Sequence, residues 1–140
     1  MNRNALCMMG IAALLAIMAG CATTGKAVSD EDLLDALKQK CTERVSEQDI
    51  DGLLACYSGD FYCEPIGDKE KMRAFLEDAK SMGFLDDVEL NFANATTVIQ
   101  GDKATTDPVE ISGYFGYISA TFHAEKRDGV WLITGMEAVL

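Results

Sequence analysis

The chain has 140 residues, 23 of them acidic and 12 basic, so its formal net charge is −11. A surface of this sign repels phosphate backbones and anionic lipid headgroups, which excludes nucleic-acid binding and charge-driven attachment to membranes. One histidine and the lack of any Cys-x-x-Cys pair argue against a metal site, and we expect no cofactor.

The first 20 residues have the layout of a secretory signal. Arg3 gives a basic start, and the apolar run from Ala5 to Ala19 is shorter than the roughly 20 residues that span a bilayer. Small residues then precede Cys21, an ending that resembles the lipobox of bacterial lipoproteins. The resemblance implies cleavage before Cys21, lipid on its sulfur, and membrane attachment through that lipid.

Two alternatives stay open for this segment, namely an uncleaved membrane anchor and secretion with a free Cys21. Cleavage leaves 120 residues (140 less 20), which suits one domain over residues 29–140, preceded by the lipidated cysteine and a short tether at 21–28. We expect a lipid-anchored protein of the cell envelope that faces the periplasm. Ala22 follows the cysteine where an aspartate often retains lipoproteins at the inner membrane, so the outer membrane is favoured.

The first half of this domain predicts helices. Ser29 precedes three acidic residues and can cap a helix whose apolar residues recur at helical spacing from Leu33 to Val45. Asp49 can cap a second helix. We expect that helix to end at Gly59, because glycine suits a left-handed C-terminal turn.

An extended piece and a third helix follow. Residues 61–64 form the extended piece, which Pro65 stops. Gly67-Asp68 then opens a helix with an apolar stripe, and Gly83 closes it.

The second half predicts strands. Apolar and polar residues alternate, and turn signals separate the runs at Gln100–Lys103 and Arg127–Gly129. Pro108 indicates an edge or a bulge, and Gly113 and Gly116 indicate a bend. The expected strands cover residues 88 to about 99, 104–112, 117–126 and 130–138.

Together these stretches resemble the nuclear transport factor 2-like superfamily, which includes ketosteroid isomerases and polyketide-cyclase-like domains. The resemblance implies an α+β fold in which N-terminal helices pack into a strongly curved antiparallel sheet, as a cone-shaped, cystatin-like roll around a pocket. Fold alone does not fix function. The stretches on which the resemblance rests are Asp49–Phe61, Glu64–Gly67 leading into Lys71–Leu76, Val98–Ala104 and Asp128–Met136.

Glu64 is the candidate catalytic residue that this resemblance implies. Glu64-Pro65 lies where ketosteroid isomerases carry the acid-proline pair that moves a proton. A poorly solvated carboxylate makes a useful base, because desolvation raises its pKa. The positions of the family's oxyanion partners hold Cys41 and, approximately, Thr121. The base would therefore lack the group that usually contributes most to such catalysis.

The expected ligand-binding residues are aromatic. Tyr62, Tyr114, Tyr117 and Phe122 are candidates for the lining of a pocket that holds a small apolar ligand, although core packing explains them as well. His123 shares a strand face with Thr121 and is either a surface histidine or a pocket group. Alternation alone does not decide which face turns inward.

Cysteines and the last strand raise two further questions. Once Cys7 leaves with the signal and Cys21 is lipidated, a buried thiol is the expectation for Cys41, and a bridge from Cys56 to Cys41 or Cys63 stays open. The last strand is apolar at every position from 130 to 133, so both of its faces should be covered. A homodimer formed through the sheet would cover the second face.

The sequence therefore favours a lipid-anchored envelope protein whose cone-shaped domain binds a small apolar ligand or a partner protein without catalysis. One alternative is an enzyme of the isomerase, cyclase or dehydratase kind that uses Glu64 as its base. The other is a domain whose cone is filled by side chains and which acts only in interaction or dimerisation.

Overall fold

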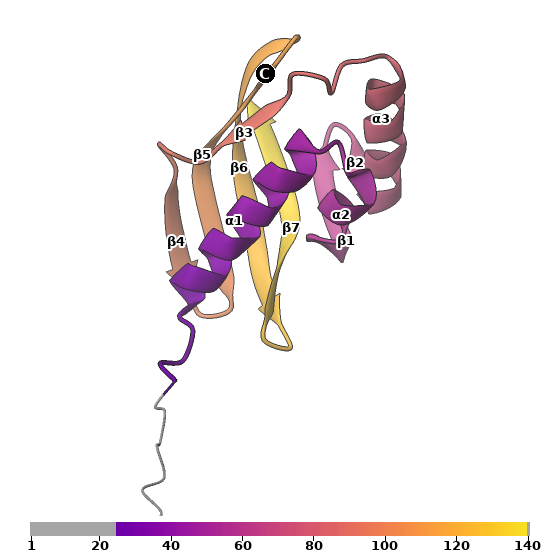
Figure 1. Cartoon of the computed structure of the whole chain (residues 1–140). Coiled ribbons are helices and arrows are strands. Elements are labelled where there is room, and N and C mark those ends of the chain that lie inside the picture. The colour runs from indigo at the N-terminus through magenta and orange to yellow at the C-terminus, as the bar shows by residue number, and fades with distance from the viewer. Residues whose placement is uncertain (1–24, 140) are drawn as a thin grey trace, which may run out of the picture.

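The computed structural model describes residues 25–139 (Figure 1). The expected signal and the lipidation of Cys21 lie outside the described residues. The described chain is an α+β fold with helices on one side of a mixed sheet. Its elements in chain order are α1 (Asp30–Ser46), α2 (Ile50–Leu54), β1 (Tyr57–Glu64), β2 (Gly67–Asp68), α3 (Lys69–Ser81), β3 (Glu89–Asn91), β4 (Thr96–Gln100), β5 (Lys103–Gly113), β6 (Gly116–Arg127) and β7 (Val130–Val139).

The helix starts follow the capping residues of the sequence. The Ser29 hydroxyl accepts a hydrogen bond from the Asp32 amide at 3.1 Å, and the Asp32 carboxylate accepts one from the Ser29 amide at 3.4 Å. This reciprocal pair satisfies two amides that the first turn of α1 leaves without helical partners. Asp49 and Asp68 cap α2 and α3 in the same way, through the amides of the third residue after each.

The expected end of the second helix is wrong. α2 stops at Leu54, and Gly59 lies within β1 instead of closing a helix. Tyr57 is already paired with Ile133 of β7, so backbone hydrogen bonding to a strand far away in sequence overrides the local helical pattern. Gly83 does close α3, with a left-handed φ of +75°.

One sheet holds all seven strands of the described chain in the order β2-β1-β7-β6-β5-β3, with β4 also paired to β5. The expectation of a purely antiparallel sheet is wrong at one place, because β1 runs parallel to β7. The whole segment from β2 to β6 lies between these two strands in the chain, which provides the long connection that a parallel pair needs.

Two interruptions shape the strands next to β5. The expected strand from 88 to 99 is split into β3 and β4, with a turn closed by a hydrogen bond from the Ala95 amide to the Phe92 carbonyl. In β5 the register shifts between Thr106 and Val109, so Pro108 marks a bulge as expected. The bulge reverses which side chains of β5 face the helices.

α1 crosses one face of the sheet, and we call that face inner and the opposite face outer (Figure 1). Ala120, Phe122 and Ala124 of β6 face inward and are buried, whereas His123 and Glu125 lie on the outer face. Beneath α1 the core gathers apolar side chains from nearly every element. A second cluster packs Leu34 against Trp131.

The N-terminus of α1 is tied to the sheet by Asp30. Its carboxylate accepts hydrogen bonds from the Trp131 indole at 3.0 Å and from the Lys126 ammonium at 3.0 and 3.1 Å. The Lys126 nitrogen also lies 5.8 Å from the centre of the Trp131 ring. The start of the domain is thus fixed to the last hairpin of the sheet.

Candidate functional site

Glu64 lies at the end of β1, on the exposed side of the strand. Its register partner on β7 is Glu137, another exposed carboxylate. Thr121 pairs with Glu137 on the other side, and its hydroxyl donates to Asp107 at 2.6 Å. Cys41 belongs to α1 and is buried in the core on the inner face, so it is not beside Glu64 on the outer face.

The space between α1 and the sheet is almost completely filled. Phe122 is 7% exposed and packs edge-to-face against Phe92, with the ring centres 6.0 Å apart. The hollow beside them holds about 20 Å³, and a second hollow near Val45 and Leu85 holds about 50 Å³. Sites for small organic ligands occupy roughly 300–1,000 Å³. Phe122 therefore contributes to the core, and in this conformation neither hollow accommodates such a ligand.

The four expected ligand-binding residues are not brought together. Phe122 lies in the core and Tyr62 is exposed on β1. Tyr114 lies in the turn between β5 and β6, and Tyr117 lies near the start of β6. Tyr114 does acquire a partner that the sequence analysis missed. The ring of Phe84, from the connection between α3 and β3, stacks on it at a centre distance of 6.4 Å and an interplanar angle of 11°.

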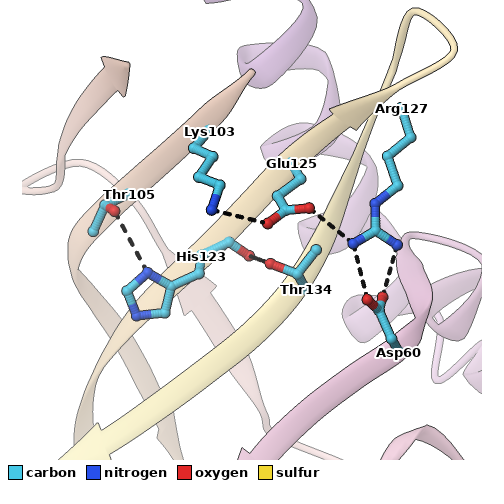
Figure 2. Close-up of polar contacts among 7 residues, drawn as sticks. All are labelled: Asp60, Lys103, Thr105, His123, Glu125, Arg127 and Thr134. Carbon is cyan, nitrogen blue, oxygen red and sulfur yellow. Dashed lines mark hydrogen bonds and ion pairs between the residues drawn. The ribbon is translucent and has the colours of Figure 1, made fainter. Parts of the chain in front are cut away.

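A charged network crosses the outer face (Figure 2). The Arg127 guanidinium donates to both carboxylate oxygens of Asp60, at 2.8 and 2.9 Å, and to Glu125 at 2.8 Å. Glu125 also lies 3.6 Å from the Lys103 ammonium. These contacts hold the pKa of the Asp60 carboxyl well below its usual range and lower that of Glu125, in both cases chiefly through the hydrogen bond from Arg127. The network links β1, β5 and β6 across the face.

His123 lies beside this network on the outer face. Its Nδ1 is 3.4 Å from the Thr105 hydroxyl, and its Nε2 is 3.2 Å from a Glu137 oxygen. The ring is partly exposed, at 39%, and its neighbours are a hydroxyl and an exposed carboxylate. His123 is thus a group of the outer surface and not of a pocket between α1 and the sheet.

Three free thiols are buried in the described core, at Cys41, Cys56 and Cys63. The Cys56 thiol donates to the Gly52 carbonyl at 3.6 Å. The neighbouring Cys56 thiol, together with burial, raises the pKa of Cys41, whereas the neighbouring Cys41 thiol lowers the pKa of Cys56. These positions agree with the expectation of a buried thiol at Cys41.

Two further observations concern residues 25–139 alone. No cluster of three or more histidine, cysteine or acidic side chains among them is arranged to hold a metal ion. No helix in that range is both long and apolar enough to cross a membrane.

Comparison with solved structures identifies the fold. A protein of unknown function with a cystatin-like fold from Nostoc punctiforme aligns with a TM-score of 0.63 at 15% identity, over 79% of this chain and 92% of that one. An NTF2-like protein of unknown function from Pseudomonas putida aligns with a TM-score of 0.61 at 19% identity, over 75% and 82%. A putative calcium/calmodulin dependent protein kinase II association domain from Xanthomonas campestris gives 0.61 at 17% identity, over 81% and 89%.

The chain therefore has the NTF2-like, cystatin-like fold that its motifs resemble. No family model matches the sequence, and no match appears among the curated proteins. At identities of this size the likeness establishes the fold alone, and the neighbours named here are largely of unknown function.

Proposed function

We propose that this chain is a lipid-anchored protein of the cell envelope whose domain binds a partner protein through its surface and catalyses no reaction. The observation that carries the proposal is the filled interior. A hollow of about 20 Å³ holds about one water molecule, since a water needs roughly 10–15 Å³ of this kind of space. The exposed surfaces are then the parts of the domain that are available for binding.

The surroundings of Glu64 support a role without catalysis. A general base works best where desolvation tunes its pKa and a nearby donor stabilises the developing negative charge. Glu64 is exposed, and its register neighbour is the carboxylate of Glu137, which accepts hydrogen bonds and does not donate them when ionised. An enzyme of the isomerase kind would need a different arrangement around this residue.

Attachment through lipid on Cys21 is part of the same proposal. Residues 25–29 lead directly into the start of α1, which Asp30 fixes to the sheet (Figure 1). A lipid at position 21 would therefore hold this end of the domain close to the membrane. The Xanthomonas campestris neighbour, whose name describes a putative association domain, is consistent with an interaction role.

The test uses the full chain, extracted from membranes in mild detergent and run on a native gel. We expect a complex with another protein and no small molecule in organic extracts of the purified chain. A stoichiometric apolar ligand, with the chain migrating alone, would contradict the proposal. Growth with an alkyne-bearing fatty acid should label the wild-type chain and not the Cys21→Ser variant.

A homodimer through the outer face is the second candidate, because the helices of the described chain lie on the other side of the sheet (Figure 1). The half-buried Leu132 and the exposed Val130 of β7 offer it apolar contact. Facing copies would also bring together the acidic side chains of Glu64, Asp107 and Glu137. A complex of twice the chain's own mass on the native gel would favour this candidate.

A further inference from the structure

Exposed aromatic side chains gather at one end of the domain, at the β5–β6 turn and the connection from α3 to β3. Tyr114 is 83% exposed, Tyr117 61%, Phe115 50% and Phe84 43%. We call these four residues the aromatic end. Single exposed apolar side chains are ordinary, but a group of large ones marks an interaction surface. Tyrosine is also among the residues enriched where interfaces derive most of their binding energy.

The aromatic end is held in a defined shape. Glu89 of β3 pairs with Ser112 of β5, which joins the two contributing segments beside the stacked rings of Phe84 and Tyr114. A Cβ at Gly113 would stand 2.8 Å from the Phe115 ring, so the missing side chain leaves room for that ring. Pre-ordered side chains lose little entropy on binding, which favours affinity.

The two chain segments that contribute the aromatic end are themselves acidic. The sequence has no lysine or arginine from residue 81 to 102, nor from 104 to 125. The same segments carry Asp86, Asp87, Glu89 and Glu110. Desolvation, and to a smaller extent the nearby Glu110 carboxylate, raise the pKa of the Tyr117 hydroxyl. A partner that matches this surface presents positive charge around an apolar centre.

The aromatic end also lies far from the tether. In Figure 1 residues 25–29 leave the domain at its lower end, whereas the β5–β6 turn and the α3–β3 connection lie at its upper end. The 17 residues of α1 run between these ends, over roughly 25 Å at 1.5 Å per residue. A lipid on Cys21 would leave the aromatic end facing away from its own membrane.

We propose that the aromatic end docks a partner protein through an apolar pocket bordered by lysine or arginine side chains. This inference rests on the proposed function and deepens it by naming the surface and the chemistry of the partner. A second copy of the chain would bring like acidic charges together at this surface. An anionic membrane would be repelled by the same charges.

The experiment places the photoreactive amino acid benzoylphenylalanine at position 114 of the full chain, in cells that naturally make the protein. The matched control positions are Val98 and Val130, which are 52% and 56% exposed and lie on other parts of the surface. A fourth position, Tyr62 at 54%, reports on the outer face. Illumination and mass spectrometry then identify what each position contacts.

We expect one discrete protein to crosslink to position 114 and not to positions 98 or 130, at a site flanked by lysine or arginine. Asp87→Lys should reduce that yield several-fold, whereas Glu70→Lys, the same charge change on α3, should leave it unchanged. With the partner identified, Tyr114→Ala should weaken its binding at least about tenfold, as for a central interface tyrosine. Binding should also weaken as ionic strength rises.

Other outcomes overturn the inference. A product of twice the chain's own mass would assign the aromatic end to self-association, and crosslinked lipid would assign it to a membrane. A protein that crosslinks only to position 62 would refute the inference while leaving the proposed function standing. No protein product at any position, together with a stoichiometric bound ligand, would refute both.

Discussion

The stability of the Phe122→Ala variant tests whether the Phe122 ring lies in a filled core or in an open pocket. The Phe122 side chain is 7% exposed, and a buried aromatic side chain removes about 150–250 Å² from water. At 25 cal/mol per Å² this corresponds to about 4–6 kcal/mol, of which the methyl group of alanine retains a part. Loss of the edge-to-face contact with Phe92 adds about 0.5–1.5 kcal/mol. Area-based values of this kind are upper estimates, because the unfolded chain already buries part of its apolar surface. We expect the free energy of unfolding to fall by about 3–5 kcal/mol, as for other buried phenylalanines.

The assay is urea unfolding followed by the fluorescence of Trp131, the only tryptophan, which is 4% exposed in the folded chain. With a urea dependence of about 1–3 kcal/mol per molar, the midpoint should fall by roughly 1–5 M. Tyr114→Ala is the control, because its ring is 83% exposed and loses mainly its stacking on Phe84, so the free energy of unfolding should fall by at most about 1 kcal/mol.

A loss below about 1 kcal/mol for Phe122→Ala would refute this reasoning, because it would mean that the ring lies against solvent in an accessible pocket. The variant offers a second readout. The enlarged apolar hollow should bind benzene, as cavities made in this way do, whereas the wild-type chain should not. Benzene binding by the wild-type chain would show that the cone is more open than the structure indicates.

Three further predictions concern the helix start, the outer face and the lipid. Ser29→Ala should lower the free energy of unfolding by about 1 kcal/mol, measured by thermal denaturation, because the capping pair with Asp32 is lost. Arg127→Gln should lower the urea midpoint near pH 7, and this difference should shrink as the pH falls below about 4. The folded pKa of Asp60 lies below its unfolded value near 3.9, so the contact stabilises the folded chain above that pH and is lost as the pH falls toward the folded pKa. Cys21→Ser should move the chain from the membrane fraction to the aqueous fraction, measured by immunoblotting.

Each of these predictions has a contradicting result. An unchanged melting temperature in Ser29→Ala would show that the first turn of α1 does not depend on its cap. A difference between wild type and Arg127→Gln that persists undiminished at low pH would show that Asp60 is not the partner that matters. Membrane retention of Cys21→Ser would favour an uncleaved anchor over lipidation.

Local chemistry in the sequence was enough to predict several features. Ser29, Asp49 and Asp68 cap helices as expected, because a short polar side chain next to free amides acts over three residues. The turn before β7 forms at Asp128-Gly129, whose φ values of +50° and +78° suit the residues present. Motif order likewise led to the cystatin-like fold that the structural neighbours show.

Contacts between residues far apart in the sequence decided where β1 begins, which face of β6 turns inward and how the interior is filled. Tyr57 joins β1 because Ile133 pairs with it from the far end of the chain, and no local pattern carries that information. Alternation along β6 showed that Phe122 and His123 face opposite ways, but only the position of α1 determined that Phe122 turns into the core. The stacking of Phe84 on Tyr114 joins segments 30 residues apart, and whether the cone is filled depends on side-chain volumes from many elements at once. The sequence by itself therefore determined helix starts, turns and the fold class, whereas the tertiary structure alone decided which surfaces are left for function, because packing couples residues that the chain keeps far apart.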